Sequence, residues 1–131
     1  MNTNHAAVWI DHEEAKIFHV SADSFETLNV RAPKHHVHRH PVGMEERRQH
    51  PADAKRFFED VVHALLGARE ILVVGPSTAK LELIRHLHKH HPALETRVVG
   101  IETVDHPTSG QLAAHVRQYF RAVDRLRATA Y

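Results

Sequence analysis

The first third of the chain arranges hydrophobic and polar positions in a way that predicts three short β-strands. Residues 7–10 are hydrophobic throughout, residues 15–20 alternate, and residues 25–32 alternate again. Short polar turns at 11–14 and 21–24 separate these segments. Strands joined by such short turns are expected to form an antiparallel meander.

The second half of the chain predicts three helices with two strands between them. Hydrophobic residues recur three and four positions apart from Ala54 to Leu65, with Pro51 at the start of this stripe and Gly67 after its end. The pattern predicts an amphipathic helix that buries one face. The hydrophobic run 71–74 then predicts a strand in the interior of a sheet.

The remaining pattern continues this alternation of helix and strand. A second helix is expected after the turn that follows residue 74, with Ser77 as its capping residue and Pro92 as its end. Residues 97–101 predict the fifth strand, and an amphipathic segment at about 109–127 predicts the last helix.

The predicted order of elements is therefore βββαβαβα. Strand–helix–strand units favour parallel pairing through right-handed crossovers, so two parallel strands are expected to extend the meander. We predict an α/β fold with a ribonuclease-H-like mixed five-stranded sheet and helices on both faces. The length and the absence of internal repeats predict a single domain over residues 1–131.

The segment 33–50 interrupts the periodic pattern. It holds two prolines, one glycine, five histidines and four lysine or arginine residues. An irregular segment of this length inside a small domain is usually functional or disordered. Between Arg31 and Arg56 seven basic residues stand against three acidic ones, although the formal net charge of the chain is only +1. The near-neutral average thus conceals a local basic region.

Composition limits the chemistry further. The chain has 15 histidines and no cysteine, which excludes disulfides, thiolate zinc sites and cysteine nucleophiles. No hydrophobic run is long enough to span a bilayer, and the first residues lack the pattern of a signal peptide. We expect a cytoplasmic protein of bacterial type that does not associate with membranes.

Two stretches carry a family resemblance. Residues 71–80, ILVVGPSTAK, form a strand that ends in Val-Gly-Pro and enters a helix through a short residue and a lysine. This arrangement resembles the central domain of archaeal and eukaryotic class I translation release factors and of Pelota. Residues 100–112, GIETVDHPTSGQL, resemble small stand-alone bacterial proteins described as translational machinery proteins. The resemblance extends from about Ala6 to Arg125.

The resemblance implies a ribosome- or RNA-facing protein without hydrolytic activity. In the release factors, the segment between the third strand and the first long helix carries a Gly-Gly-Gln tip that supports hydrolysis of peptidyl-tRNA. This sequence has no Gly-Gly-Gln, so we expect no such activity. Arginine and histidine can bind phosphates and stack on unpaired bases. The residues that we expect to contact RNA are Lys34, His35, His36, His38, Arg39, His40, Arg47, Arg48, Gln49, Arg117 and Arg121.

Histidine-rich metal binding is one alternative. In an extended segment His36, His38 and His40 would point to one side, where imidazoles could bind zinc, nickel or copper. A second cluster ends the second helix and consists of His86, His88, His90 and His91. Protonated histidines also suit a helix C-terminus without any metal, and no HExxH pattern is present. We therefore predict no metal site and no cofactor.

A metal-dependent nuclease is the second alternative, because ribonuclease-H-like enzymes hold carboxylates on the sheet for two metal ions. Asp11 follows the first strand, and Glu102 and Asp105 follow the fifth. Glu59 and Asp60 lie on the first helix without an evident inward partner. We interpret these carboxylates as turn and surface residues. A module that binds protein rather than RNA is a third class, and the sequence does not define the oligomeric state.

Overall fold

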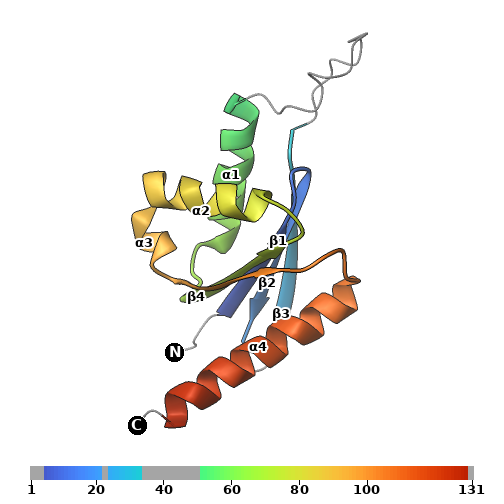
Figure 1. Cartoon of the computed structure of the whole chain (residues 1–131), viewed down its shortest axis with the longest axis vertical. Coiled ribbons are helices and arrows are strands. Elements are labelled where there is room, and N and C mark those ends of the chain that lie inside the picture. The colour runs from blue at the N-terminus through green and yellow to red at the C-terminus, as the bar shows by residue number, and fades with distance from the viewer. Residues whose placement is uncertain (1–4, 22–23, 34–50, 130–131) are drawn as a thin grey trace.

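The computed structural model describes residues 5–21, 24–33 and 51–129. Figure 1 shows a twisted sheet with helices on either side of it. The elements in chain order are β1 (His5–Ile10), β2 (Glu14–Val20), β3 (Phe25–Arg31), α1 (Pro51–Leu65), β4 (Glu70–Gly75), α2 (Ala79–His90), α3 (Pro92–Glu95), β5 (Val98–Thr103) and α4 (Ser109–Thr129).

The five strands form one mixed sheet in the order β3-β2-β1-β4-β5. The pairs β1–β2 and β2–β3 are antiparallel, as the predicted meander requires. The pairs β1–β4 and β4–β5 are parallel, since a helix crosses over between the strands of each pair. The predicted α/β fold with a mixed five-stranded sheet is confirmed.

Both faces of the sheet are covered, and β1 is buried along its whole length. Alternate residues of this strand face two separate hydrophobic cores: Val8 and Ile10 face one, and Ala7 and Trp9 face the other. The first core lies beneath α1, α2 and α3, and the second lies beneath α4 (Figure 1). Helices therefore cover both faces, as the sequence predicts.

The helix α1 follows the predicted pattern closely. Its buried positions are Phe57, Phe58, Val61, Val62 and Leu65, the members of the hydrophobic stripe that pack into the first core. The chain turns after this helix at Gly67, whose φ of +90° is a backbone conformation that glycine adopts without strain.

The start of α2 differs from the prediction, because Ser77 does not cap the helix. Thr78 precedes the first helical residue, and its backbone already has helical angles (φ −80°, ψ −8°). A residue in this conformation does not place its hydroxyl over the free amides of the first turn. The Thr78 hydroxyl instead donates to Glu82, and the Ser77 carbonyl accepts a hydrogen bond of 2.6 Å from Lys80 Nζ.

The end of α2 holds an element that the sequence pattern does not predict. Pro92 ends α2 as expected, but it also begins the short helix α3. His91 lies between the two helices: its amide donates to Leu87 of α2, and its carbonyl accepts from Leu94 of α3. A helix this short has few hydrogen bonds of its own, so the burial of Leu94 in the first core is what stabilises α3.

The helix α4 starts with a capping box. The amide of Gln111 donates to the Thr108 hydroxyl, and the amide of Thr108 donates to the Gln111 side-chain oxygen. Thr108 is therefore the capping residue of this helix. Its Leu112, Val116 and Phe120 are buried against the sheet. Within the described residues, no helix combines the length and hydrophobicity needed to cross a membrane.

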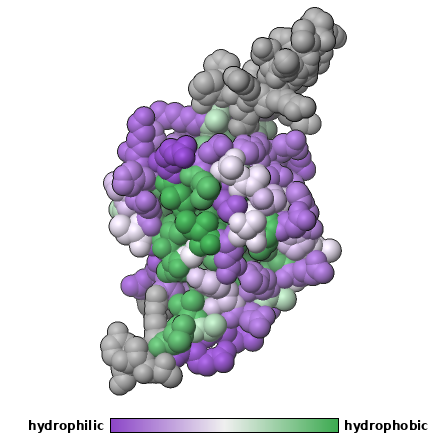
Figure 2. Space-filling model, in the orientation of Figure 1, coloured by the Kyte–Doolittle hydropathy of each residue, from purple (hydrophilic) through white to green (hydrophobic). Residues whose placement is uncertain are grey.

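The strands β3 and β5 form the two edges of the sheet. Five of the seven residues of β3 are exposed. On β5, Val99 and Ile101 are exposed, and Figure 2 shows hydrophobic side chains gathered in the middle of the visible face, between α3 and α4 in that view. The pairing of β5 with β4 shifts register between Ile71 and Leu72, so that Val99 has no partner in the ladder.

The glycine at the end of β4 sets the spacing between this strand and β1. A Cβ atom on Gly75 would overlap the backbone carbonyl oxygen of Ile10. We expect Gly75→Ala to lower the free energy of unfolding by roughly 2–4 kcal/mol, because relief requires a backbone shift between two central strands. Urea unfolding followed by circular dichroism measures this change.

Gly110→Ala is the matched control. A Cβ atom on Gly110 meets nothing within 4 Å, and the position lies in the first turn of α4. The same methyl group should leave stability unchanged or raise it by up to about 1 kcal/mol, because alanine is the better helix former. Equal effects of the two substitutions would contradict the close approach of β4 to β1.

Candidate functional site

The parallel strands β1, β4 and β5 end at the same edge of the sheet, called here the carboxyl edge. In open α/β sheets, ligands bind outside the carboxyl ends of the strands. Asp11 follows β1, Gly75 ends β4, and Asp105 follows β5 by two residues. The end of β3 lies at the same edge, since the amide of Ala32 donates to the carbonyl of Glu13 in the β1–β2 turn.

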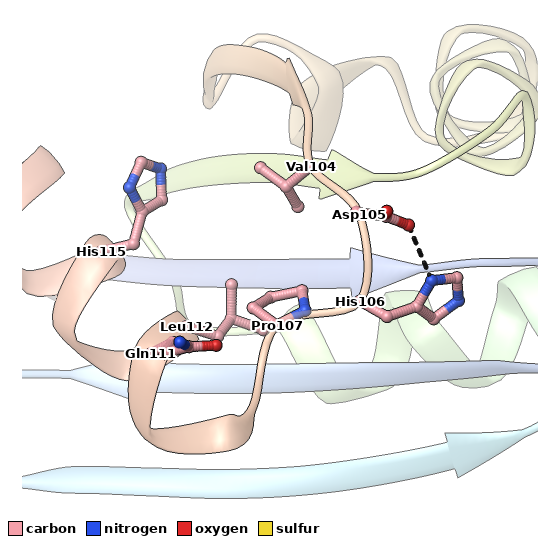
Figure 3. Close-up of a pocket in the computed structure, with 7 residues that line it drawn as sticks. All are labelled: Val104, Asp105, His106, Pro107, Gln111, Leu112 and His115. Atoms are coloured by element: carbon pink, nitrogen blue, oxygen red, sulfur yellow. Dashed lines mark hydrogen bonds and ion pairs between the residues drawn. The ribbon is translucent and has the colours of Figure 1, made fainter.

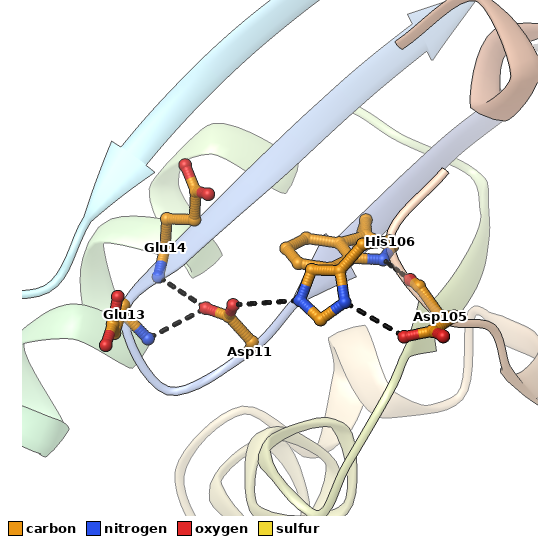
Figure 4. Close-up of polar contacts among 6 residues, drawn as sticks. Asp11, Glu13, Glu14, Asp105 and His106 are labelled. Carbon is orange, nitrogen blue, oxygen red and sulfur yellow. Dashed lines mark hydrogen bonds and ion pairs between the residues drawn. The ribbon is translucent and has the colours of Figure 1, made fainter. Parts of the chain in front are cut away.

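Asp11 holds the β1–β2 turn. One of its carboxylate oxygens accepts hydrogen bonds of 2.8 Å from the amides of Glu13 and Glu14 (Figure 4). The amide of Asp11 donates to the carbonyl of Glu14 and closes the turn. This is an Asx-type turn, in which a short side chain replaces a backbone acceptor. The interpretation of Asp11 as a turn residue is confirmed.

His106 joins the β5–α4 connection to this turn. Its Nδ1 lies 2.9 Å from Asp105 Oδ1, and its Nε2 lies 3.9 Å from Asp11 Oδ2 (Figure 4). Trp9 supports the connection from below: its indole N–H donates to the Asp105 carbonyl, and its ring meets the His106 ring edge-on. Both imidazole nitrogens of His106 face carboxylates.

A pocket of about 540 Å³ lies beside this connection. Figure 3 shows Val104, Pro107 and Leu112 around it, with His115 on one side and His106 projecting away on the other. Its lining residues are Val104, Asp105, His106, Pro107, Gln111, Leu112 and His115. Its volume falls within the range of small-ligand sites, and its lining mixes hydrophobic with polar side chains.

The carboxylates considered for a nuclease do not form a metal-binding group. Glu102 is paired with His115 at 2.7 Å, and the Asp105 side chain is 93% exposed. Among the described residues, Asp11, Glu102 and Asp105 do not belong to any cluster of three metal-ligating groups within 4.8 Å. Glu59 does have a partner, contrary to the expectation from the sequence: it points toward α2.

Two clusters of potential metal ligands occur among the described residues. Their members are Glu59, His86 and His91 in the first, and His5, Glu70 and Asp124 in the second. The hydrogen bond from His91 is the main cause that lowers the pKa of Glu59 below its ordinary value; burial opposes it, and the bond from His86 lowers the pKa further. The only sequence signal for the first cluster is the histidine-rich end of α2.

Tyr119 of α4 binds the edge strand. Its hydroxyl donates to the Val99 carbonyl at 3.3 Å, and its ring lies so close to Gly100 that a Cβ atom there would overlap it. Burial raises the pKa of the Tyr119 hydroxyl, and the carboxylates of Glu102 and Glu70 add to this effect. The phenol therefore remains a hydrogen-bond donor.

Most of the residues expected to contact RNA lie outside the described part of the chain. These are Lys34, His35, His36, His38, Arg39, His40, Arg47, Arg48 and Gln49, which include the three candidate metal ligands of that segment. Arg117 and Arg121 are described, and both are exposed on α4 as predicted. The guanidinium carbon of Arg117 lies 4.8 Å from the centre of the Phe25 ring, a cation–π distance.

Arg117 lies at the opposite end of the domain from the described residues that flank the segment 34–50. Arg117 contacts Phe25 at the start of β3, whereas the chain enters the segment 34–50 just after the end of this strand. At the usual rise per residue, seven strand residues span about 20 Å. In Figure 1 the chain leaves β3 and enters α1 at the top, while α4 lies at the bottom. The described residues do not form one continuous basic surface.

The chain is similar in structure to factors of translation. Pelota from Thermoplasma acidophilum aligns with a TM-score of 0.59 and 20% identity over 88% of this chain and 32% of its own. The archaeal translation termination factor aRF1 aligns with a TM-score of 0.60 and 14% identity over 97% of this chain and 40% of its own. Dom34 from Saccharomyces cerevisiae aligns with a TM-score of 0.52 and 10% identity over 76% and 29%.

At these identities the similarity establishes the fold, which is that of a release-factor-like domain. The chain spans about a third of the length of these structures. No protein-family model matches the sequence. No curated protein matches it either.

The Asx-type turn gives a test that separates a structural from a catalytic Asp11. We expect Asp11→Ala to lower the free energy of unfolding by about 1–2 kcal/mol, because two turn amides lose their acceptor. Asp11→Asn keeps that oxygen and should change stability by only a few tenths of a kcal/mol. Urea unfolding of both variants measures the difference.

An RNA degradation assay with Mg²⁺ or Mn²⁺ accompanies this experiment. We expect no cleavage by the wild-type protein. Cleavage that both Asp11 substitutions abolish would contradict the structural interpretation, because a catalytic carboxylate does not tolerate replacement by an amide.

Proposed function

We propose that this protein is a non-catalytic, ribosome-associated or RNA-binding factor related to translation termination and rescue factors. The segment 33–50 is its main contact with RNA, and Arg117 and Arg121 of α4 form a second contact. The protein acts in the cytoplasm and needs no cofactor. It does not hydrolyse peptidyl-tRNA.

The fold similarity is the observation that carries this proposal. One structural neighbour is described as a translation termination factor, and another as a termination-like factor involved in RNA quality control pathways. The alignments extend over 76–97% of this chain, so the similarity involves the whole arrangement of sheet and helices. Since a fold alone does not determine function, the proposal also depends on the basic residues of the segment 33–50 and of α4.

The position of the basic segment supports the RNA contact. Pro33 and Pro51 flank it at one end of the domain, where the carboxyl edge also lies. Seven basic residues stand against three acidic ones between Arg31 and Arg56. Such an excess attracts phosphates, while the rest of the chain, with ten basic and thirteen acidic residues, limits non-specific association.

The exposed arginines of α4 support a second contact. Arg121 is exposed, and Arg117 keeps its charge while its guanidinium lies over Phe25. Because Arg117 lies about 20 Å along β3 from the point at which the chain enters the segment 34–50, we expect the two contacts to reach separate phosphates. A folded or ribosomal RNA offers such spaced phosphates more readily than a short single strand.

The experiment is filter binding of ribosomes and of tRNA over a salt series. A variant in which five residues of the segment 33–50 are replaced by serine should bind at least tenfold more weakly. The slope of the log association constant against log salt concentration should also become less steep by about 2–3, because three arginine–phosphate contacts are lost. Binding should also be tighter at pH 6 than at pH 7.5, since imidazoles become protonated and positively charged as the pH falls through this range. The variant carries serine at His35, His36, Arg39, Arg47 and Arg48.

A second variant controls for net charge. Like the first variant, it loses two histidines and three arginine or lysine residues. All five positions are exposed in the described domain, and this variant should bind ribosomes and tRNA like wild type. Its serine substitutions are at His63, Arg69, Arg85, His88 and Lys89. Equal binding by the first variant and wild type, or equal weakening by both variants, contradicts the proposed contact. Ribosome-dependent release of peptide from peptidyl-tRNA contradicts the non-catalytic assignment.

A further inference from the structure

Three side chains from different elements converge where α1 meets the end of α2. Glu59 comes from α1, His86 from α2 and His91 from the junction of α2 with α3. One carboxylate oxygen, Glu59 Oε2, lies 2.6 Å from the Nε2 atom of His86 and 2.6 Å from that of His91. The ligand atoms of the three residues all lie within 4.8 Å of one another.

We propose that Glu59, His86 and His91 bind one divalent transition-metal ion, with zinc as the preferred ion. A carboxylate oxygen has no proton to donate, so in the ion-free state both Nε2 atoms must carry the protons of these hydrogen bonds. A metal ion takes the place of those two protons, using the two nitrogen lone pairs and the same carboxylate. Two imidazoles and one glutamate are a donor set that zinc uses in proteins.

The geometry needs only a small adjustment. Bonds of about 2.0–2.2 Å from a tetrahedral zinc ion place its donor atoms about 3.4 Å apart, so the distance of 2.6 Å between the Glu59 oxygen and each imidazole nitrogen has to grow by roughly 0.8 Å. The side chains of Glu59 and His91 are about one third exposed, which leaves them room to move. The His86 side chain, 7% exposed, can stay in place.

The surrounding structure holds the ligands in position. The His86 ring packs against Phe58 at 5.5 Å between centroids, and its helix is anchored in the first core by Leu83 and Leu87. The His91 backbone is fixed from both sides by hydrogen bonds to α2 and α3. A metal site needs such rigid support, because ligands on loose segments lose binding energy when they become ordered.

Three protein ligands leave a fourth position open. His90 is the nearest further imidazole, with its ring centroid 4.8 Å from that of His86, but it is exposed and lies outside the cluster of converging ligand atoms. We therefore assign the fourth position to solvent. The sequence predicts no metal site. The candidates that it offers are the histidines of the segment 33–50 and the cluster at the end of the second helix, which includes His86 and His91, and the structure adds Glu59 to these two.

The second cluster of potential ligands is the weaker one. His5 Nε2 lies 3.7 Å from Asp124 Oδ1, and the Asp124 side chain is 57% exposed. Glu70 adds the third group at 3.1 Å from the same nitrogen. A single imidazole nitrogen with two carboxylates suits zinc less well than two imidazoles do.

The test is a titration of tag-free protein, stripped with a chelator, with ZnCl₂ in a calorimeter. The protein used carries serine at His36, His38 and His40, so that this segment cannot supply the ligands. We expect one equivalent of zinc to bind with a dissociation constant in the micromolar range or below. Zinc should also raise the midpoint of thermal unfolding, because it binds only the folded arrangement.

Substitutions in the same background identify the ligands. Glu59→Gln, which preserves shape, should raise the dissociation constant at least tenfold and abolish the thermal shift. His88→Gln on the exposed side of α2 and Asp124→Asn in the second cluster should leave both unchanged. Because His86 is buried, His91→Gln serves as the histidine variant, and circular dichroism checks that each variant is folded.

Bound Co²⁺ supplies an independent readout, since its visible absorption reports nitrogen and oxygen ligation in the folded protein. We expect a band that appears at one equivalent and is lost in Glu59→Gln. Absence of zinc binding, or zinc binding that Glu59→Gln leaves intact, overturns the proposal and leaves the cluster as a hydrogen-bonded link between helices. RNA binding is measured separately and does not enter this test.

Discussion

The burial of β1 on both faces is the constraint from which the architecture follows. Apart from His5, the residues of β1 are hydrophobic, so exposure of either face to water would destabilise the fold, and both faces of the sheet need a cover of helices. The chain meets this need with α1 and α2 on one face and α4 on the other. Parallel pairing of β1 with β4, and of β4 with β5, then brings three strand ends to one edge. The polar residues of the carboxyl edge lie together for this reason.

The sequence predicts the parts of the structure that depend on local pattern, and it misses those that depend on tertiary contacts. Strands, helices and the two-sided sheet follow from hydrophobic periodicity, which burial enforces. The predicted cap at Ser77 was wrong because Thr78 is the residue before the first helical one, and its helical backbone angles leave it without a capping hydrogen bond from its side chain. The sequence does not indicate that Glu59 pairs with His86 and His91, because these residues lie 27 and 32 positions away and meet Glu59 only through helix packing.

The candidate functional regions also differ in whether local sequence or tertiary packing reveals them. The basic segment is recognisable from composition alone, whereas the distance between the two ends of β3 becomes evident only from the structure. The pocket beside Pro107 and the cluster at Glu59 lie on opposite faces of the sheet. Substitutions in one of these two regions should therefore leave the other intact.

The register shift in β5 has a consequence for how the protein behaves when it is concentrated. An exposed edge strand with hydrophobic residues is a template on which another chain can add a strand. In β5 the residue without a ladder partner, Val99, interrupts the regular spacing of amides and carbonyls, and such bulges bend and twist a strand. The Tyr119 hydroxyl also donates a hydrogen bond to the Val99 carbonyl, which leaves this carbonyl less available to a strand of another chain. The irregularity thus protects the most hydrophobic edge of the sheet against edge-to-edge aggregation.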